Sequence, residues 1–142
     1  MYDAVTEEAK NSDIIIKAAA VADYTPLNVS DNKIKKKDGD MSIALKRTKD
    51  IIGTLGEHKK EGQFICGFSM ETENVIANSK DKLIKKNMDM IVANNVKVAG
   101  AGFGTDTNVV TIITGEDNIE LPMMSKEDVA SKILDFIMAK RR

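Results

Sequence analysis

Three short, continuous apolar runs, separated by longer polar stretches, most constrain how this chain can fold. The runs are DIIIKAAAV (13–21), QFICGFSM (63–70) and MDMIVANN (88–95). They lack the polar alternation of a half-exposed strand, which is typical of strands covered on both faces in a parallel sheet. The segment 71–87 between the second and third runs has helical spacing. Strands and helices therefore alternate, which predicts an α/β fold with a Rossmann-like, mostly parallel sheet flanked by helices.

The remaining shorter segments predict antiparallel additions and two more helices. MSIALKRT (41–48) alternates apolar and polar residues, so it is interpreted as a half-exposed strand. NVVTIIT (108–114), a GEDN turn and IELPM predict a hairpin. A short helix is expected over 49–60, and MYDAVTEEAKNSD (1–13) is typical of the second half of an amphipathic helix with no capping residue before it. With 142 residues, we expect a single domain, 1–142.

Two longer helices are expected to bury one face each. The last one, from residue 125 onward, starts at Ser125 and Asp128, which form a capping-box-like pair. The residues expected to point inward are Ile76, Leu83 and Ile84 in the helix of 71–87, and Val129, Ile133, Leu134 and Ile137 in the last helix.

Composition excludes several classes of function. The formal net charge is −1, so we expect no whole-molecule attraction to nucleic acid or to an anionic membrane. No run approaches the roughly 18 apolar residues of a membrane span, and no secretory signal pattern is seen. Cys66 is the single cysteine and His58 the single histidine, which leaves no internal disulfide, zinc site or Cys/His nucleophile pair. A single cysteine suits a reducing cytoplasm, and the apolar neighbourhood of Cys66 predicts an inert thiol.

The ends of the three apolar runs are the first place to expect a ligand, because ligands of open α/β sheets bind beyond the carboxyl ends of the strands. Small or polar residues end each run: AAAVAD, GFSMET and ANN. Small side chains at 18–20 would let a ligand approach the backbone, although such residues also simply pack under helices. Asp23 could accept hydrogen bonds from a ribose or a base, or it could cap a turn.

Lysines form two clusters that would suit a triphosphate, whose charge requires several cations. KIKKK contributes Lys33, Lys35, Lys36 and Lys37, and the second cluster is Lys80, Lys82, Lys85 and Lys86. Within the second, residues 82 and 86 are four apart and share a helix face. The alternative is a solvated surface in both cases. Phe68 likewise could stack on a base or belong to the core.

The residues alone predict an α/β domain with a site for a phosphate-rich ligand, and no known motif defines the function further. GAGFGTD (100–106) precedes a strand rather than a helix and so fails the context of a dinucleotide fingerprint. The chain contains no G-x-S-x-G elbow, P-loop or H-E-x-x-H motif. Two alternatives stay open beside an enzyme: a nucleotide-binding or dimerisation module without chemistry, and an NAD(P)-binding Rossmann domain.

Five motifs together resemble one enzyme family. KAAAVADYTP, NKIKK, GFSMETEN, KLIKKNMDMIVANNV and GFGTDTNVVTII occur in the order and spacing of phosphopantothenate–cysteine ligase, the synthetase half of the bacterial bifunctional coenzyme A biosynthesis flavoprotein. The resemblance implies activation of the carboxylate of 4′-phosphopantothenate by CTP with Mg²⁺. The acyl-cytidylate then reacts with the amine of L-cysteine, which displaces CMP. It also implies a cytoplasmic homodimer, with FMN confined to a fused decarboxylase domain not present in these residues.

The same resemblance implies roles for particular residues. Lys33 matches the catalytic lysine that stabilises charge on the reacting phosphates, and Phe68 matches the residue beside the cytosine. No metal-ligating residue is assigned, and the loop 24–40 is expected to be a mobile flap. The residues expected to contact the nucleotide are Lys17, Ala18, Ala19, Asp23, Lys33, Thr48, Lys49, Asp50, Ile51, Phe68, Lys82 and Lys86.

Two departures from the family pattern qualify these expectations. RTKD (47–50) stands where the family usually has K-N-P-D, so backbone contacts from 48–51 are expected without the proline turn. The family's N-terminal strand, its Gly-rich phosphate loop and an Asn needed to turn over the acyl-cytidylate have no counterpart here. We therefore expect a truncated synthetase domain that keeps much of the CTP face and is inactive alone.

Overall fold

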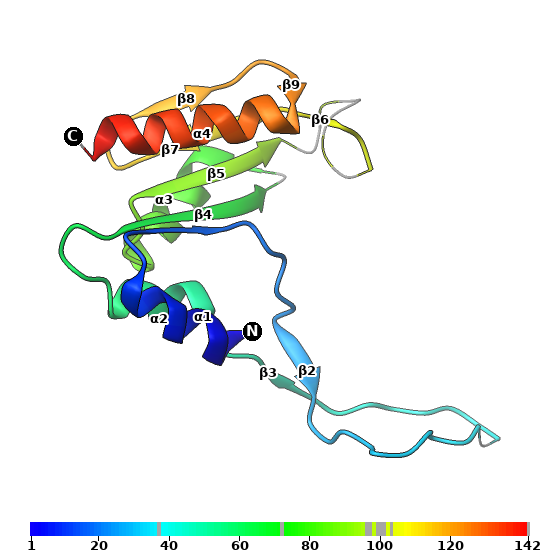
Figure 1. Cartoon of the computed structure of the whole chain (residues 1–142). Helices are drawn as coiled ribbons and strands as arrows, with labels where there is room; N and C mark the ends of the chain where they lie inside the picture. Colours follow the sequence, from blue (N-terminus) through cyan, green and yellow to red (C-terminus); the bar gives the residue numbers. More distant parts are fainter. Residues whose placement is uncertain (37, 72, 96–97, 99–101, 103, 142) are drawn as a thin grey trace. The chain divides into compact units, whose positions relative to one another are not determined.

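The computed structural model describes all residues except 37, 72, 96, 97, 99–101, 103 and 142. Its contacts divide the chain into two compact units (Figure 1). The larger unit comprises 1–18 and 51–142, and the smaller comprises 19–50. Each unit is described by itself.

A mixed five-stranded sheet forms the centre of the larger unit, in the order β1-β4-β5-β7-β8. The strands are β1 (Ile14–Lys17), β4 (Phe64–Glu71), β5 (Met90–Asn95), β7 (Val110–Ile113) and β8 (Asn118–Glu120). Parallel pairing joins β1 to β4 and β4 to β5, while β7 and β8 are added antiparallel. Each of the three apolar runs thus contributes a parallel strand. The first run was expected to be covered on both faces, but its strand β1 is short, lies at the edge of the sheet and has no buried residue. The predicted α/β class and the hairpin are both confirmed.

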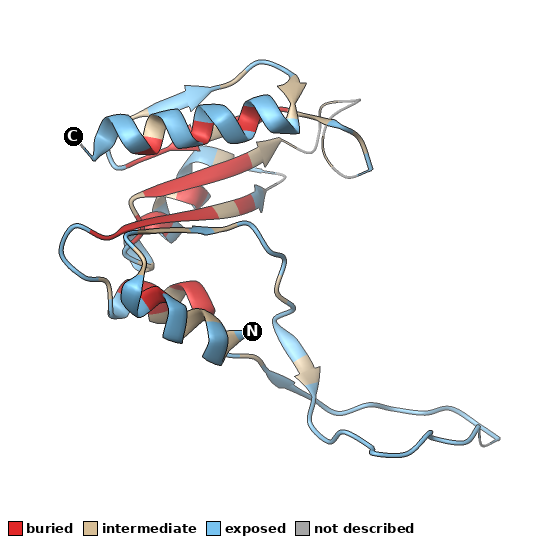
Figure 2. Cartoon of the chain, in the orientation of Figure 1, coloured by how far each residue is buried: buried red, intermediate tan, exposed pale blue. Residues whose placement is uncertain are grey.

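One face of this sheet is covered by the last helix, α4 (Lys126–Lys140). Phe64, Cys66 and Val92 from the strands meet Val129 and Ile133 from the helix in one buried cluster. In Figure 2, buried residues line β4, β5 and the inner side of α4. Burying each such side chain contributes about 1.5–3 kcal/mol, so this layer is a principal source of stability.

The opposite face is covered by α2 (Ile51–Glu57) and α3 (Val75–Lys85). Alternation along β4 directs Ser69 to this face, where its hydroxyl lies 3.1 Å from the hydroxyl of Ser79 in α3. A Cβ added at Gly67 would lie 2.8 Å from the side chains of both Ile52 and Met88. Small residues in β4 therefore let this helix layer approach the sheet closely.

The helix ends and short elements follow the expected patterns in part. The opening segment forms α1 (Tyr2–Glu8) and a 3-10 turn, η1 (Ala9–Asn11). At the start of α4, the hydroxyl of Ser125 accepts the backbone N–H of Asp128 at 3.0 Å, which confirms the predicted cap. A two-stranded pair, β6 (Thr107–Asn108) with β9 (Met124–Ser125), precedes this helix.

Three side chains expected to point inward are exposed instead. Ile76 and Ile84 are 47% and 74% exposed, and Leu134 is 51% exposed. In α3 the buried residues are Ser79 and Leu83, four apart, so residue 84 lies about 100° around the helix from the inner face. Residue 76 lies in the first turn of α3, before the first buried residue, Ser79. The same rotation takes Leu134 away from the buried Ile133.

The smaller unit is an antiparallel ribbon formed by β2 (Tyr24–Pro26) and β3 (Leu45–Arg47). Its base is held by Thr48, whose hydroxyl donates to the carbonyl of Ala22 at 2.7 Å. The strand expected over 41–48 is reduced to β3. Its apolar residues were expected to be half-buried, but Met41, Ile43 and Leu45 are 68%, 60% and 57% exposed. Two strands alone have no second layer to cover them.

We predict that Gly56→Ala destabilises the fold although it removes a helical glycine. Asn87 donates to the Gly56 carbonyl at 2.9 Å, and a Cβ at residue 56 would overlap the carbonyl oxygen of Lys86. Overpacking of this kind should lower the free energy of unfolding by about 2–3 kcal/mol, which urea denaturation followed by circular dichroism would measure. Gly115→Ala is the matched control, since its Cβ meets nothing within 4 Å. Equal stability of the two variants would contradict this prediction.

Candidate functional site at the carboxyl ends of the strands

The carboxyl ends of β4 and β5 carry a polar network that the two layers hold in place. Asn94 donates to the carbonyl of Ser69 at 3.4 Å, and Asn108 donates to the side-chain oxygen of Asn94 at 2.7 Å. The side-chain oxygen of Asn108 also accepts the backbone N–H of Val109 at 3.0 Å. This network ties β4, β5 and β6 together at the edge of the sheet where a ligand is expected.

The sequence interpretation noted ANN only as a strand end and gave Asn108 no role. A polar residue at the end of a buried strand was the available signal for Asn94. Nothing comparable marked Asn108, because its contact depends on where β6 lies beside β5.

Several predicted nucleotide contacts lie on the larger unit. Lys17 is the last residue of β1, Ala18 follows it, and Ile51 is buried as the first residue of α2. Phe68 is half-buried and packs against the cluster under α4. Core packing of this ring is thus observed, while stacking on a base stays a prediction.

Lys82 and Lys86 lie on the other side of the sheet from Phe68. The first belongs to the last turns of α3 and the second is its C-cap. Because α3 covers the face opposite α4, the aromatic ring and the two ammonium groups do not meet across one face. α3 runs back from the carboxyl end of β4 to the amino end of β5, so these two lysines also lie toward the amino ends of the strands.

The smaller unit carries Ala19, Asp23, Lys33, Thr48, Lys49 and Asp50. Its ribbon brings Asp23 and Thr48 together, since the backbone N–H of Thr48 donates to the carbonyl of Asp23 at 2.9 Å. Lys33 is exposed on the connection between β2 and β3. Residue 37 of the KIKKK motif, and residues 100, 101 and 103 of GAGFGTD, lie outside the described residues.

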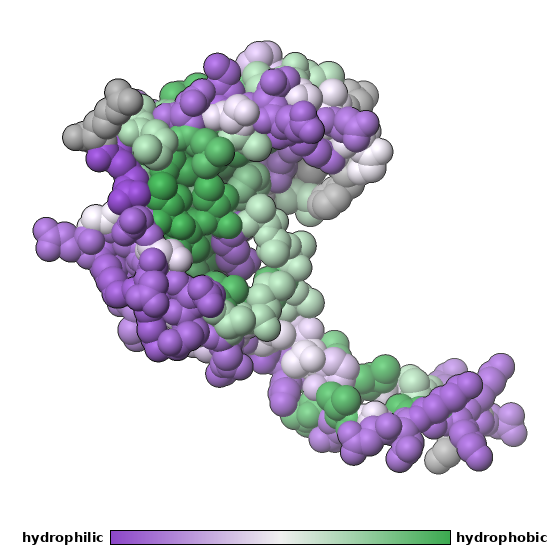
Figure 3. All heavy atoms as spheres, viewed as in Figure 1, coloured by the Kyte–Doolittle hydropathy of each residue, from purple (hydrophilic) through white to green (hydrophobic). Residues whose placement is uncertain are grey.

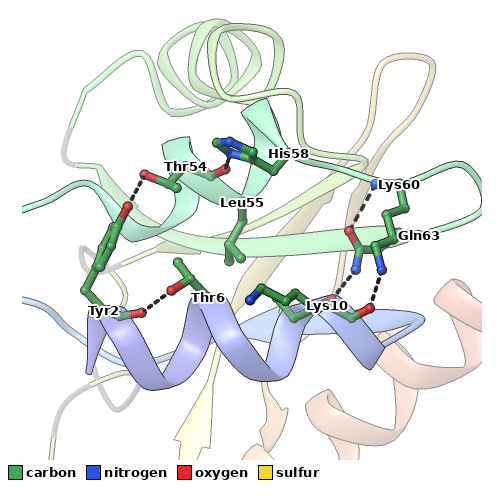
Figure 4. A pocket seen from close by; sticks show the side chains of 9 residues that line it. Tyr2, Thr6, Lys10, Thr54, Leu55, His58, Lys60 and Gln63 are labelled. Carbon is green, nitrogen blue, oxygen red and sulfur yellow. Dashed lines mark hydrogen bonds between the residues drawn. The ribbon is translucent and has the colours of Figure 1, made fainter.

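A pocket of about 440 Å³ lies between α1 and α2 (Figure 4). Its floor is apolar, and hydroxyl groups of Tyr2 and Thr54 approach within 3.4 Å at one end. At the other end, the amide of Gln63 donates to the carbonyls of Ala9 and Ser12 at 2.8 and 2.7 Å. The α1–α2 pocket is lined by Tyr2, Thr6, Ala9, Lys10, Thr54, Leu55, His58, Lys60 and Gln63.

Three groups bear on nucleophilic chemistry, metal binding and membrane insertion: the single thiol, the potential metal ligands and the helices. Burial, and secondarily the charge of Asp89, raise the pKa of the Cys66 thiol to about 12. Among the residues that the structure describes, no three His, Cys, Asp or Glu side chains gather as a metal site. The described helices also include none with the length and apolar character needed to cross a bilayer.

Comparison with known proteins identifies the family. Residues 1–140 match the model of the DNA/pantothenate metabolism flavoprotein C-terminal domain. The coenzyme A biosynthesis bifunctional protein CoaBC of Bacillus subtilis (strain 168) is 53% identical over 140 residues, covering 98% of this chain and 34% of that protein. The chain therefore belongs to the DNA/pantothenate metabolism flavoprotein C-terminal domain family, and the predicted relationship is confirmed.

Two further similarities delimit what the match covers. The crystal structure of the C-terminal domain of a CoaBC protein aligns with a TM-score of 0.77 and 43% identity, covering 98% of this chain and 62% of that one. A cysteine/cysteine sulfinic acid decarboxylase from an unknown prokaryotic organism is 47% identical, with 97% of this chain and 39% of the relative covered. The chain thus spans between a third and two fifths of the length of these two curated relatives.

We predict that the native thiol of Cys66 is almost unreactive. A rise from 9.0 to about 12 in its pKa lowers the thiolate fraction at pH 8 about a thousandfold, so DTNB should react only after unfolding. The unfolded thiol ionises above about pH 9 while the folded one does not, so stability should fall as the pH rises from 9 toward 12. Ser131→Cys, which adds an exposed thiol, is the control. A native wild-type chain that reacts as fast as this variant would disprove the prediction.

Proposed function

We propose that this chain supplies the CTP-binding part of a phosphopantothenate–cysteine ligase that acts in coenzyme A biosynthesis in the cytoplasm. The observation that carries the proposal is the family match over 1–140 together with three parallel strand ends aligned at one edge. The biosynthetic role printed for the Bacillus subtilis relative supports it. We do not extend the decarboxylase activity in the name of the other relative to this chain, because most of that protein lies outside the match.

In the proposed reaction, a carboxylate oxygen of 4′-phosphopantothenate attacks the α-phosphorus of CTP and pyrophosphate leaves. The amine of L-cysteine then attacks the acyl carbon of the acyl-cytidylate, CMP leaves, and phosphopantothenoylcysteine is formed. Both steps develop negative charge on phosphate oxygens, so the catalytic power expected from this chain is electrostatic. We assign that role to Lys33, supported by Lys82 and Lys86.

Each unit carries residues that we propose as nucleotide contacts. Small residues at Ala18 and Ala19 allow close approach to the strand end, and Phe68 presents its ring beside the base. Asp23 and the segment 48–51 are proposed to contribute polar contacts, and Lys17 is proposed as a cation at the end of β1. We propose 24–40, the connection that carries Lys33, as a mobile flap over the bound nucleotide.

Mg²⁺ fits this chain as a partner of the triphosphate. Since the described residues hold no cluster of three metal-ligating side chains, a magnesium ion would be bound largely through nucleotide phosphates, as is usual for this ion. When bound, it would neutralise phosphate charge. FMN is assigned to a fused decarboxylase domain of the longer relatives, outside the matched residues.

We further propose that these 142 residues do not complete the reaction alone. The solved CoaBC domain extends well beyond the match, which covers 62% of it. The sheet face under α4 also ends in exposed apolar groups, with Ile16 and Met70 39% and 55% exposed. Both observations are in keeping with further elements of the enzyme that contribute to the phosphopantothenate and cysteine sites.

A homodimer is supported by the apolar surface of the ribbon. Val29, Ile34, Met41 and Ile43 are between 60% and 81% exposed in this unit, and Figure 3 shows their region as apolar patches among hydrophilic side chains. Exposed apolar groups gathered on a slender element are typical of an interaction surface. We propose that a second copy of the chain covers them.

Calorimetric titration with CTP and Mg²⁺ tests the nucleotide site. We expect saturable binding that prefers CTP to ATP and weakens about tenfold or more in Lys33→Ala, because charge-assisted contacts to phosphate are lost. Lys132→Ala, on the exposed side of α4, is the matched control and should bind as wild type does. Without any CTP binding by a folded chain, the nucleotide site proposed here has to be abandoned. Formation of phosphopantothenoylcysteine by the chain alone would contradict only the proposed inactivity.

Sedimentation analysis tests the dimer. Ile43→Lys should raise the dimer dissociation constant by about one to two orders of magnitude, since it places a charge where an apolar side chain is buried in the assembly. Ile84→Lys alters a comparably exposed isoleucine on α3 and is expected to leave the dimer intact. A wild-type chain that remains monomeric at micromolar concentration would refute the dimer, while dissociation by both variants would refute the assignment to the ribbon.

A further inference from the structure

The α1–α2 pocket has the features of a small-molecule site, and its lining residues are different from the proposed nucleotide contacts. Gln63 immediately precedes β4 and bonds to the segment just before β1, so this end of the pocket lies at the amino ends of the strands. The nucleotide contacts on the larger unit include Lys17 and Phe68 toward the carboxyl ends. The volume of about 440 Å³ falls within the usual range for small ligands.

The pocket is polarised along its length. Ala9 and Leu55, both buried, form an apolar floor between the two helices. The Tyr2 and Thr54 hydroxyls at one end are 3.4 Å apart, which is longer than a well-formed O–H···O bond. A ligand hydroxyl or carbonyl could therefore join this pair without breaking a strong contact.

The opposite end is cationic. Lys60 donates from its ammonium group to the carbonyl of Lys10, and the ammonium group of Lys10 pairs with Glu7. That ion pair is exposed, with side chains 60% and 69% accessible, so it contributes little and can be exchanged for a ligand anion. Figure 4 shows Lys10 lying along α1 beneath Leu55, beside the floor of the pocket.

We propose that the α1–α2 pocket binds small amphipathic carboxylates, with the carboxylate at Lys10 and Lys60 and the apolar body over Ala9 and Leu55. A bound ligand would bridge α1 and α2. Binding requires neither the nucleotide nor the ligase reaction, so this proposal is independent of the function proposed above.

Hexanoate is a suitable probe, with 1-hexanol and hexylamine as neutral and cationic counterparts of similar size. In ¹H–¹⁵N NMR spectra of the full chain, hexanoate should shift the amide signals of Thr6, Ala9, Thr54 and Leu55 saturably. We expect 1-hexanol to bind about fivefold or more weakly and hexylamine not to bind, because the carboxylate contact is lost or reversed.

Two variants test the cationic end and the apolar space of the pocket separately. Lys10→Gln should weaken hexanoate binding about fivefold, while Lys132→Gln on α4 should not change it. Thr6→Phe fills the pocket from α1 and should abolish the shifts, with unchanged signals of Ile65 and Ile91 as the check that the sheet is folded. The proposal is overturned if hexanoate causes no saturable shifts, if it binds no better than 1-hexanol, or if folded Thr6→Phe binds it unchanged.

Discussion

The burial of β4 and β5 between two helix layers is the constraint on which the rest of the larger unit depends. Ile65, Cys66, Met90 and Val92 are fully buried, so a one-residue slip of either strand would exchange its two faces and drive small or polar residues into the α4 cluster. That penalty fixes the register, in which Phe68 lies opposite Val92. The fixed register in turn aligns the strand ends and brings Asn94 to the carbonyl of Ser69.

The strands could be predicted because their signal is local. A strand covered on both faces must be apolar throughout, and QFICGFSM and MDMIVANN satisfy this wherever their neighbours lie. DIIIKAAAV has the same pattern, but its strand β1 lies at the edge of the sheet and is only partly covered. The cap at Ser125 is equally local, since the hydroxyl and the amide that it accepts are three residues apart. Features that depend only on residues within one turn or one strand can therefore be predicted without knowledge of the tertiary structure.

The errors arose where the outcome depends on the neighbour. Leu134 and Ile84 are each adjacent to a buried residue, and only the orientation of the helix against the sheet decides which of the two is covered. For 41–48 the alternating pattern was correct for a strand with one covered face, but the ribbon supplies no cover. Asn108 could not be found at all, because its partner belongs to another strand and the contact exists only after β6 is placed.

The order of the motifs in the sequence does not show which face of the sheet each motif occupies. GF in β4 and the two lysines at the end of α3 are close in sequence, yet the pleat and the helix send them to opposite sides of the sheet. Because α3 runs back toward the amino end of β5, the lysines also lie away from the carboxyl end of β4. The order of the motifs does not show this separation.

The short helix α2 contacts both the α1–α2 pocket and the end of α3. It begins directly after the segment 48–50 assigned to the nucleotide, its middle residues Thr54 and Leu55 line the α1–α2 pocket, and Gly56 abuts the carbonyl of Lys86 without room for a methyl group. A seven-residue helix held this tightly cannot shift at one point alone. A ligand that displaces α2 from α1 would also disturb its contact with the end of α3, where Lys82 and Lys86 are proposed to bind the nucleotide.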